Sequence, residues 1–366
     1  MYNVPVLWNI SISNEVAILN FDLLKRIAET PGVPSREEKI RQLVLDEMKP
    51  LVDDLQVDAM GSVIGHKKGN GGPRVMLAAH MDEIGFLVRH IDDKGFLRIQ
   101  PVGGFDPRVL MAQRVYVHGF SGERLLGALQ PAAKPVHLLS EEERKKSVQI
   151  EDLFIDLGMT ADQVKEKVEV GDPVTLARTA ERVGGNVMSK TLDNRVSVYV
   201  MLEALRMVGQ HDCEILAVAT VQEEVGLRGA VTAAYHLQPD IGIAIDVTLA
   251  GDFPGNPEQE QVSRIGQGPA IKIMDGSLIC HPQLVRHFRD VAEKHDIPYQ
   301  LEILPRGGTD AGGIQRSRGG VPSFTLSIPC RYVHTVNETA SVADIDNAVA
   351  LLARYLEEAH TGNYSF

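Results

Sequence analysis

The sequence predicts an α/β protein in two parts: a three-layer α/β/α domain with a mixed sheet, and a β-barrel inserted into it. Helix and buried-strand patterns alternate before residue 84 and after residue 185, which is typical of a sheet covered by helices on both faces. Residues 84–185 instead contain short alternating segments separated by turns, as expected for antiparallel β structure. A chain of 366 residues is long enough for both parts.

The main domain begins with two predicted helices. The segments FDLLKRIAET (residues 21–30) and PGVPSREEKIRQLVLDEMKPL (residues 31–51) have apolar residues at helical spacing. Ser35 and Glu38 have the spacing of a capping box before the second helix. RVMLAAH (residues 74–80) is apolar without alternation, which predicts a strand buried on both faces. Residues 1–20 precede this pattern, and we assign them to an extension of unknown role.

The insert is predicted to span residues 84–185. Its alternating pieces include FLVRHI, GFLRIQPV, QRVYVHG and DPVTLAR, with turns such as DDKG and GGFDP between them. One helix, from Thr160 through Lys167, is expected to interrupt the strands. This pattern favours a small barrel or sandwich, and it leaves residues 21–83 and 186–366 for the main domain.

Alternation of helix and strand returns after the insert. NRVSVYVMLEALRMV (residues 194–208) places Val196, Val200 and Ala204 on one stripe and is predicted to be helical. The remaining predicted strands are at residues 214–221, 240–246, 270–274, 298–304 and 322–329, and the remaining helices at 227–237, 282–297 and 342–359.

Composition excludes several classes of protein. The net charge is −12 and no basic block offsets it, which argues against a nucleic-acid partner. No apolar run approaches the length that spans a membrane, and the first 24 residues contain no Lys or Arg, so a signal peptide is not expected either. Three widely spaced cysteines suggest no disulfide framework, and a reducing cytoplasm is the expected location.

Five short segments carry residue types that bind divalent metals, and we expect them to form one site. They are AAHMDEIGF with His80 and Asp82, KTLDNR with Asp193, TVQEEVG with Glu223 and Glu224, AIDVT with Asp246, and RYVHT with His334. Four of these segments follow predicted buried strands, and α/β proteins place their sites at the carboxyl ends of such strands. Two histidines with several carboxylates and no cysteine indicate a hydrolytic two-metal centre, whereas a structural zinc site more often uses cysteine.

Each candidate also has a purely structural interpretation. His80 fits a buried core histidine, and Asp193 precedes a helix, so an N-cap explains it completely. Asp82 fits a turn residue, or a hydrogen-bond partner that fixes the tautomer of His80. The neighbours Glu223 and Glu224 repel each other unless solvent or a metal relieves the repulsion. Near a metal, one of them can coordinate while the other transfers protons. The joint occurrence of these residues at strand ends favours the metal site.

With these residues in place, the chain resembles the co-catalytic zinc aminopeptidases, and specifically the tetrahedral (TET), or glutamyl aminopeptidase, family. HMDEIGF, DNR, EEVGLRG, DVT, GGTDAG and RYVHT match that family's motifs as they stand. The resemblance runs from about Phe21 to the C-terminus. The long insertion between Asp82 and Asp193 also resembles the TET pattern. Carboxypeptidase-like relatives carry their extra domain later in the chain, and the corresponding gap is short in single-domain aminopeptidases.

The resemblance implies a role for each candidate residue. The implied metal ligands form two sets that share one bridging carboxylate: His80, Asp193 and Asp246 for one ion, and Asp193, Glu224 and His334 for the other. The implied catalytic residues are Glu223 as general base and Asp82 as the partner of His80. The implied substrate-side residues are Gly308, Thr309 and Asp310 of the segment RGGTDAG, together with Arg331 of RYVHT.

The implied activity is removal of N-terminal residues from short peptides by a metal-activated water. It requires two divalent ions per subunit, zinc or cobalt, with manganese as a third candidate. The insert is implied to direct self-association into a tetrahedral dodecamer built from dimers. Two other readings stay open. One is a different two-metal hydrolase, such as a deacylase or a glycan-directed enzyme. The other is a non-catalytic, metal-stabilised assembly protein, against which an intact Glu223 argues.

Overall fold

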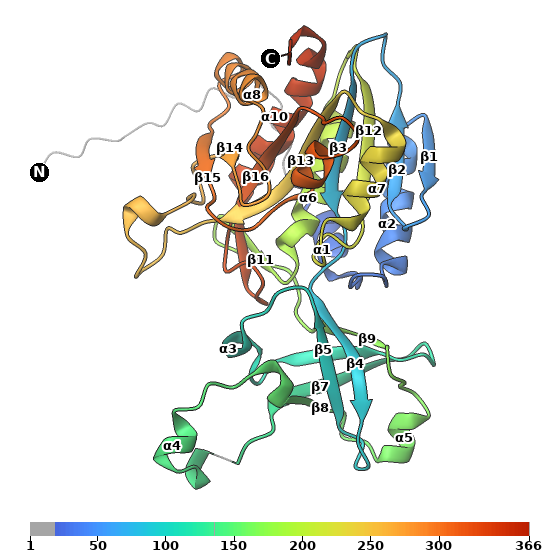
Figure 1. The fold of residues 1–366 in the computed structure, drawn as a ribbon, viewed down its shortest axis with the longest axis vertical. Helices are drawn as coiled ribbons and strands as arrows, with labels where there is room; N and C mark the ends of the chain where they lie inside the picture. Colours follow the sequence, from blue (N-terminus) through green and yellow to red (C-terminus); the bar gives the residue numbers. More distant parts are fainter. Residues whose placement is uncertain (1–18, 135, 366) are drawn as a thin grey trace, which may run out of the picture.

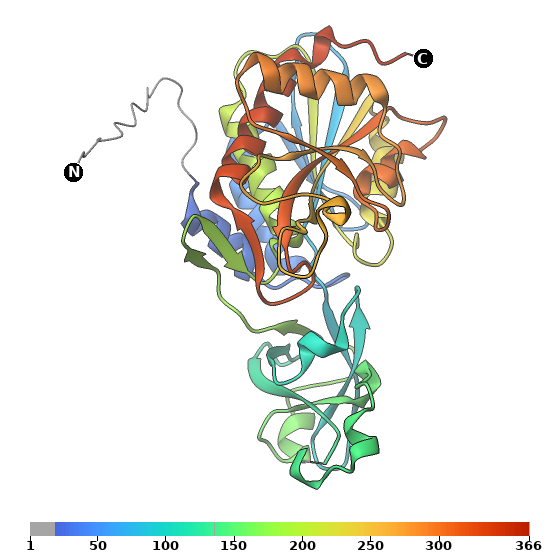
Figure 2. The same ribbon diagram turned by 90° about the vertical axis from the view of Figure 1, so that its left-hand side faces the viewer.

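The computed structural model describes residues 19–134 and 136–365. They form a large sheet covered by helices and a smaller barrel beneath it, as Figures 1 and 2 show from two sides. This arrangement confirms the predicted α/β fold with an inserted β-barrel. The predicted extension lies outside the described residues except for its last two positions. Within the described part of the chain, no helix is both long and apolar enough to cross a membrane.

The large sheet is mixed, with four parallel strands at its centre. Its main path runs β1-β2-β12-β3-β13-β16-β17-β11-β10, and β14 pairs with both β15 and β16. The strands are β1 (Asp54–Val57), β2 (Val63–Lys67), β3 (Arg74–His80), β10 (Glu181–Val183), β11 (Asn186–Ser189), β12 (Glu214–Thr220), β13 (Ile241–Leu249), β14 (Ala270–Met274), β15 (Gln300–Ile303), β16 (Ser323–Arg331) and β17 (Glu338–Ser341). Strands β12, β3, β13 and β16 are parallel neighbours, so their carboxyl ends meet at one edge.

The register of these four strands brings several candidate site residues to the same height along the sheet. Thr220 pairs with His80, Ala244 pairs with Ala78, and Asp246 pairs with Ser327. Because Asp246 lies two residues beyond Ala244, it reaches the level at which β3 ends. The strand predicted to end at Asp246 continues to Leu249, so Asp246 points from within β13 rather than from a loop.

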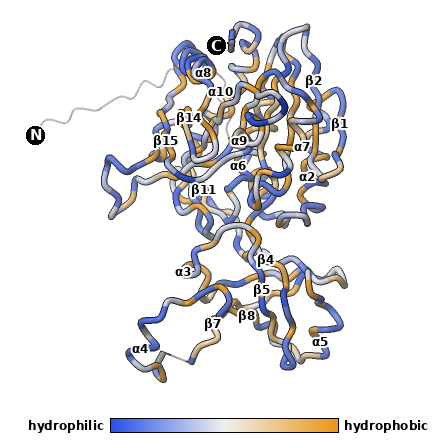
Figure 3. Tube along the Cα trace, in the orientation of Figure 1, coloured by the Kyte–Doolittle hydropathy of each residue, from blue (hydrophilic) through white to orange (hydrophobic). Residues whose placement is uncertain are grey.

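Helices cover both faces of the sheet. One face carries α1 (Phe21–Glu29), α2 (Glu38–Met48), α6 (Leu192–Met207), α8 (Pro282–Lys294) and α10 (Val342–Glu358), and most of their buried apolar side chains belong to the main core. The other face carries α7 (Arg228–Leu237) and α9 (Asp310–Gln315), and has a separate core that includes Met76, Val218 and Ile314. Figure 3 shows hydrophobic residues gathered along the inner strands, between these layers.

The capping box predicted before α2 is wrong. Ser35 has a φ of +70°, and the N-cap is Glu37, whose side chain makes no capping bond. The Ser35 N–H instead donates to Glu37 Oε1 at 2.9 Å. The helix begins two residues later than the capping-box spacing requires, with Glu37 rather than Ser35 at the N-cap position, so the sequence spacing alone misleads.

The insert is a closed barrel with the strand order β4-β5-β8-β7-β6-β9. Its elements are β4 (Gly85–Ile91), β5 (Leu97–Val102), α3 (Pro107–Leu110), β6 (Arg114–His118), β7 (Arg124–Pro131), α4 (Glu141–Arg144), β8 (Leu153–Asp156), α5 (Ala161–Lys165) and β9 (Pro173–Leu176). Phe86, Leu129 and Val174 lie in its buried core. The helix predicted from Thr160 is α5, with Thr160 as its N-cap. Strand β10 pairs with β11 in the large sheet, although the sequence places it inside the insert.

Candidate metal centre

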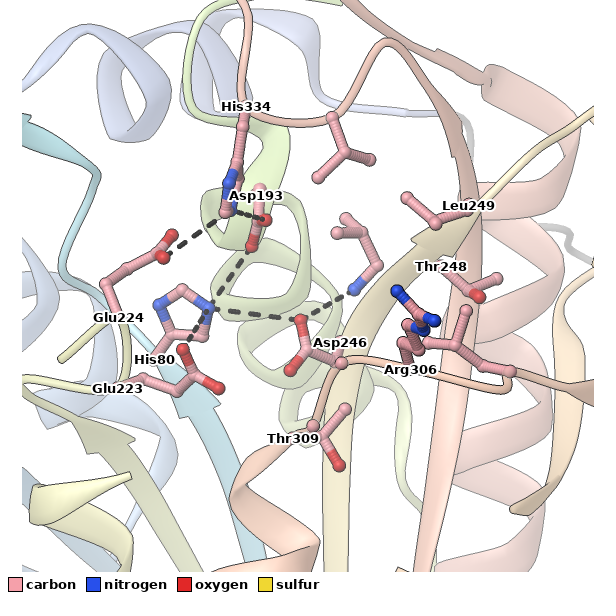
Figure 4. A pocket seen from close by; sticks show the side chains of 15 residues that line it. His80, Asp193, Glu223, Glu224, Asp246, Thr248, Leu249, Arg306, Thr309 and His334 are labelled. Atoms are coloured by element: carbon pink, nitrogen blue, oxygen red, sulfur yellow. Dashed lines mark hydrogen bonds and ion pairs between the residues drawn. The ribbon is translucent and has the colours of Figure 1, made fainter. Parts of the chain in front are cut away.

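The metal-binding residues predicted from the sequence converge on one pocket of about 300 Å³ at the carboxyl edge of the central strands. Figure 4 shows that their side chains point toward one another from separate elements. His80 ends β3, Asp193 lies near the start of α6, and Asp246 lies in β13. Glu223 and Glu224 follow β12, and His334 follows β16. The pocket lining includes all six residues: His80, Asp193, Glu223, Glu224, Asp246 and His334.

Asp193 lies between two groups of potential ligands. Its Oδ1 is 3.2 Å from His80 Nε2, and its Oδ2 is 3.2 Å from His334 Nε2. On one side, His80 Nε2 is 3.9 Å from Asp246 Oδ1. On the other, His334 Nε2 is 3.4 Å from Glu224 Oε2. Two groups of three ligand atoms, each within 4.8 Å of one another, therefore share the Asp193 carboxylate.

The charges of the pocket are unbalanced toward carboxylates. Burial raises the pKa of Glu223 well above its usual range, and the neighbouring Asp246 adds to the rise while His80 opposes it. Burial also raises the pKa of Asp246. Burial alone would lower the pKa of His334, but its contacts with Asp193 and Glu224 outweigh this and raise it to about 12. These buried carboxylates repel one another and favour positive charge beside them. Divalent cations would supply that charge and stabilise the pocket.

One ligand atom at the pocket has no partner within the described protein. Glu224 Oε1 is buried and accepts no hydrogen bond there, while Glu224 Oε2 faces His334. An orphaned, buried carboxylate oxygen costs free energy, and coordination of a cation would satisfy it. The donors available, imidazole nitrogen and carboxylate oxygen, suit divalent metal ions of the zinc and cobalt kind.

Asp82 is buried behind the pocket. Its Oδ1 accepts the N–H of Glu223 at 3.0 Å, and its Oδ2 accepts the N–H of Glu224 at 3.1 Å. His80 Nδ1 lies 3.2 Å from the Asp82 main-chain oxygen and 3.6 Å from Oδ1. The sequence pairs Asp82 with His80, and in the structure Asp82 also holds the loop that carries both glutamates.

The predicted substrate-side residues divide into two pairs. Gly308 and Thr309 line the pocket. Asp310 is buried, and accepts a hydrogen bond from Thr220 Oγ1 at 2.5 Å. Arg331 forms an ion pair with Asp252 at 2.7 Å, which directs its charge away from the pocket lining. Seven further residues line the pocket: Val247, Thr248, Leu249, Leu304, Arg306, Gly307 and Val333. Five of them lie within the segments AIDVT, RGGTDAG and RYVHT, but sequence reasoning missed Leu249 and Leu304, which lie outside every quoted segment.

The inserted barrel also reaches this site. Gly104, in the loop between β5 and α3, packs so closely that a Cβ atom there would lie 3.6 Å from His334 Nδ1. The segment GGFDP was predicted only as a turn of the insert. Its contact with a candidate metal ligand depends on how the two parts of the molecule meet, which no local pattern encodes.

Comparison with known proteins agrees with this geometry. Residues 61–351 match the family described as M42 glutamyl aminopeptidase. The chain belongs to that family. A putative aminopeptidase of Acetivibrio thermocellus is 44% identical over 334 residues, which cover 91% of this chain and 97% of the relative. The M42 chain is therefore a metal-dependent aminopeptidase, a hydrolase.

Solved structures of M42-like peptidases share its fold. An aminopeptidase from Desulfurococcus kamchatkensis superposes with a TM-score of 0.89 at 42% identity, covering 93% of this chain and 94% of that one. The TET1 peptidase of Pyrococcus horikoshii superposes with a TM-score of 0.81 at 34% identity, covering 92% and 99%. That peptidase can assemble into a tetrahedron or a large octahedral shell.

Proposed function

We propose that this M42 aminopeptidase binds two divalent metal ions per chain through a shared Asp193. His80 and Asp246 would complete one site, and Glu224 and His334 the other. The observation that carries the proposal is that Asp193 presents one oxygen to each histidine at 3.2 Å. The partnerless Glu224 Oε1 supports it. The ligand atoms suit zinc or cobalt, with manganese as a third candidate.

Glu223 is proposed to be the general base and acid of peptide hydrolysis. Bound divalent ions polarise a carbonyl group and lower the pKa of a water toward neutrality. The Glu223 carboxylate takes a proton from the attacking water and returns it to the amine that leaves. Burial raises the pKa of Glu223, which brings it nearer to the neutral range in which a group can both accept and donate a proton. Asp82 holds the backbone of Glu223 in place.

The substrates are proposed to be short peptides with a free N-terminus, whose first side chain enters the region beside the metal ligands. Gly308, Thr309 and the apolar Leu304 line that region. Asp310, one residue further on, is proposed to support this wall through its bond to Thr220, and Arg331 to support the neighbouring loop through Asp252.

We further propose that the chain works in the cytoplasm as a tetrahedral dodecamer built from dimers. The assembly of the Pyrococcus horikoshii relative supports the proposed oligomer. The three free, buried cysteines support the proposed location, because a reducing compartment keeps thiols unpaired. Residues 84–185, apart from β10, are proposed as the oligomerisation domain, and residues 21–83 with 186–366 as the catalytic domain, whose large sheet includes β10. Several large apolar side chains of the insert are exposed in the single chain, which is typical of a surface that another subunit covers: Met111, Phe120, Leu126, Leu138 and Val170.

Elemental analysis combined with a substrate screen tests the proposal. Protein reconstituted with excess zinc, cobalt or manganese should retain two ions per chain, and should cleave aminoacyl chromogenic substrates only when loaded. Matched substrates with a blocked α-amino group, and a soluble cellulose derivative, serve as controls for deacylase and glycan-directed activity. Saturation at one ion per chain would remove the two-metal assignment. If only the substrates with a blocked α-amino group are cleaved, the enzyme is a deacylase and not an aminopeptidase.

A further inference from the structure

Glu338 is a buried carboxylate directly behind the metal centre, and no motif singles it out. It is the first residue of β17 and is only 2% exposed. It lies outside the lining of the pocket, so it is not placed to coordinate a metal or to touch a substrate. A carboxylate that is buried at this depth requires strong hydrogen-bond partners.

Both oxygens of Glu338 accept main-chain hydrogen bonds from candidate metal ligands. Oε2 accepts the N–H of Asp193 at 2.9 Å, and Oε1 accepts the N–H of His334 at 2.7 Å. These two ligands lie far apart in the sequence and on different elements. One side chain therefore fixes the position of Asp193 relative to His334.

The backbone at both positions needs such support. His334 has a φ of +64°, a left-handed conformation that costs a non-glycine residue about 1–2 kcal/mol. Asp193 has non-helical φ and ψ angles inside α6, so its N–H lies at the edge of the regular helical bonding. A buried N–H without an acceptor is costly, and the Glu338 carboxylate supplies an acceptor to each.

The same arrangement occurs on the opposite side of the pocket. The Asp82 carboxylate accepts the N–H groups of Glu223 and Glu224 at 3.0 and 3.1 Å. Asp82 and Glu338 thus each hold two site residues by their main chain. Between them they position four of the six residues around the pocket.

We propose that Glu338 is a positioning residue that sets the geometry of the metal site formed by Asp193, Glu224 and His334. The inference rests on the proposed two-metal function. Removing the second oxygen acceptor should release either Asp193 or His334 from its place. In the site of Asp193, Glu224 and His334, two of the three ligands are hydrogen-bonded to Glu338. In the site of His80, Asp193 and Asp246, only Asp193 is. The His334 site should therefore weaken more.

The test compares Glu338→Gln with a matched control, Asp344→Asn. A glutamine has one acceptor oxygen and one NH₂ donor, so it presents a donor to one of the two N–H groups. Asp344 is also fully buried, and its carboxylate also accepts two main-chain N–H groups, from Gly266 at 2.6 Å and Gly268 at 2.7 Å. It contacts neither the pocket nor its ligands. Both substitutions make the same chemical change in a comparable setting.

Zinc titrations of the full-length proteins, in competition with a chromogenic chelator, provide the readout. Glu338→Gln should weaken one of two binding steps by roughly tenfold to a hundredfold, as outer partners of metal ligands do, while Asp344→Asn binds zinc as the wild type does. Glu338→Asp keeps the charge but is one methylene shorter, so it can reach only one N–H and should weaken the same step.

Each outcome is decisive. Two unchanged binding steps in Glu338→Gln overturn the proposal, as does equal weakening in Asp344→Asn. If both Glu338 variants fail to fold without metal while Asp344→Asn folds, Glu338 has a general structural role and the proposal is also overturned. A wild type that binds fewer than two ions contradicts the proposed two-metal function instead, which separates the two failures.

Discussion

Glu223 and Glu224 are neighbours in the chain but face different partners. Glu224 Oε2 lies 3.4 Å from His334 Nε2, and its other oxygen is buried without a hydrogen-bond partner among the residues that the structure describes. Glu223 Oε2 lies 3.8 Å from His80 Nε2, a looser contact that leaves its carboxylate free to move a proton. Two adjacent residues with the same chemistry should therefore respond differently to the same substitution.

Glu223→Gln should bind both metal ions and keep its thermal stability, but lose about 10²–10⁴-fold in kcat, the usual contribution of general acid–base catalysis. Glu224→Gln should lose affinity for one ion, and excess metal should partly restore its activity. Steady-state kinetics at two metal concentrations, with metal content measured in parallel, distinguish the two variants. A fully active Glu223→Gln would exclude Glu223 as the base.

Metal binding should release protons and weaken as the pH falls. The pKa of His334 is raised to about 12 by its carboxylate partners despite burial, and that of His80 is also raised. At neutral pH the metal-free protein therefore holds these imidazoles protonated, and a metal ion must displace the protons to bind. Lower pH opposes that displacement, so affinity should rise from pH 6 to pH 8. Calorimetric titrations with zinc in two buffers of different ionisation enthalpy measure the release. Identical apparent enthalpies in the two buffers would contradict it.

At the scale of elements, the loop between β5 and α3 links the barrel to the metal site. Gly104 leaves room beside the His334 ring, because a Cβ atom there would already lie in van der Waals contact with Nδ1. A larger side chain that extends from Gly104 toward His334 would enter the space of the ring. The loop of the barrel therefore lies close enough to influence His334.

Gly104→Leu should weaken metal binding by roughly tenfold, through displacement of His334. Gly319→Leu is the matched control, since a Cβ atom at Gly319 meets no other atom within 4 Å. Competition with a chelator measures the affinity, and circular dichroism verifies that both variants fold. Equal affinity in the two variants would show that the loop does not constrain His334.

At the scale of the whole molecule, the barrel separates two segments that belong to one site. Strand β3 ends at His80, and α6 begins near Asp193. The barrel between them closes on itself, yet leaves large apolar side chains such as Phe120 and Leu138 exposed. A closed barrel has no free sheet edges to pair, so subunits are expected to meet through these side chains instead.

Replacing residues 85–176 with a short Gly/Ser linker should give a smaller, soluble species. The core of the main domain is separate from that of the barrel except for Val336, which packs in the barrel core two residues from His334. The remaining chain should therefore still bind metal, with a weaker His334 site because that packing is lost. Light scattering compares its mass with that of the full-length protein. An unchanged assembly size, or a full-length protein that is monomeric at every concentration, would rule out the barrel as the main interface.

From the sequence alone, the fold class was predicted correctly, and the insert and a set of candidate metal ligands were predicted with it. This was possible because apolar runs such as residues 74–80 mark buried strands, and parallel strands bring their carboxyl ends to one edge. His80, Glu224 and Asp246 are found by that rule alone. The predicted end of the strand at Asp246 was wrong, since a buried strand can continue through a charged residue that has a partner.

The contacts that hold these residues in place become visible in the folded chain. The hydrogen bonds that Asp82 accepts from Glu223 and that Glu338 accepts from Asp193 join segments more than a hundred residues apart, and Gly104 of the barrel loop lies beside the ring of His334 in the main domain. The capping box at Ser35 failed for a related reason, since the helix begins later than its spacing indicates. Periodicity reports which side of an element is buried. The partner of a single buried atom depends on how loops far apart in the chain come together.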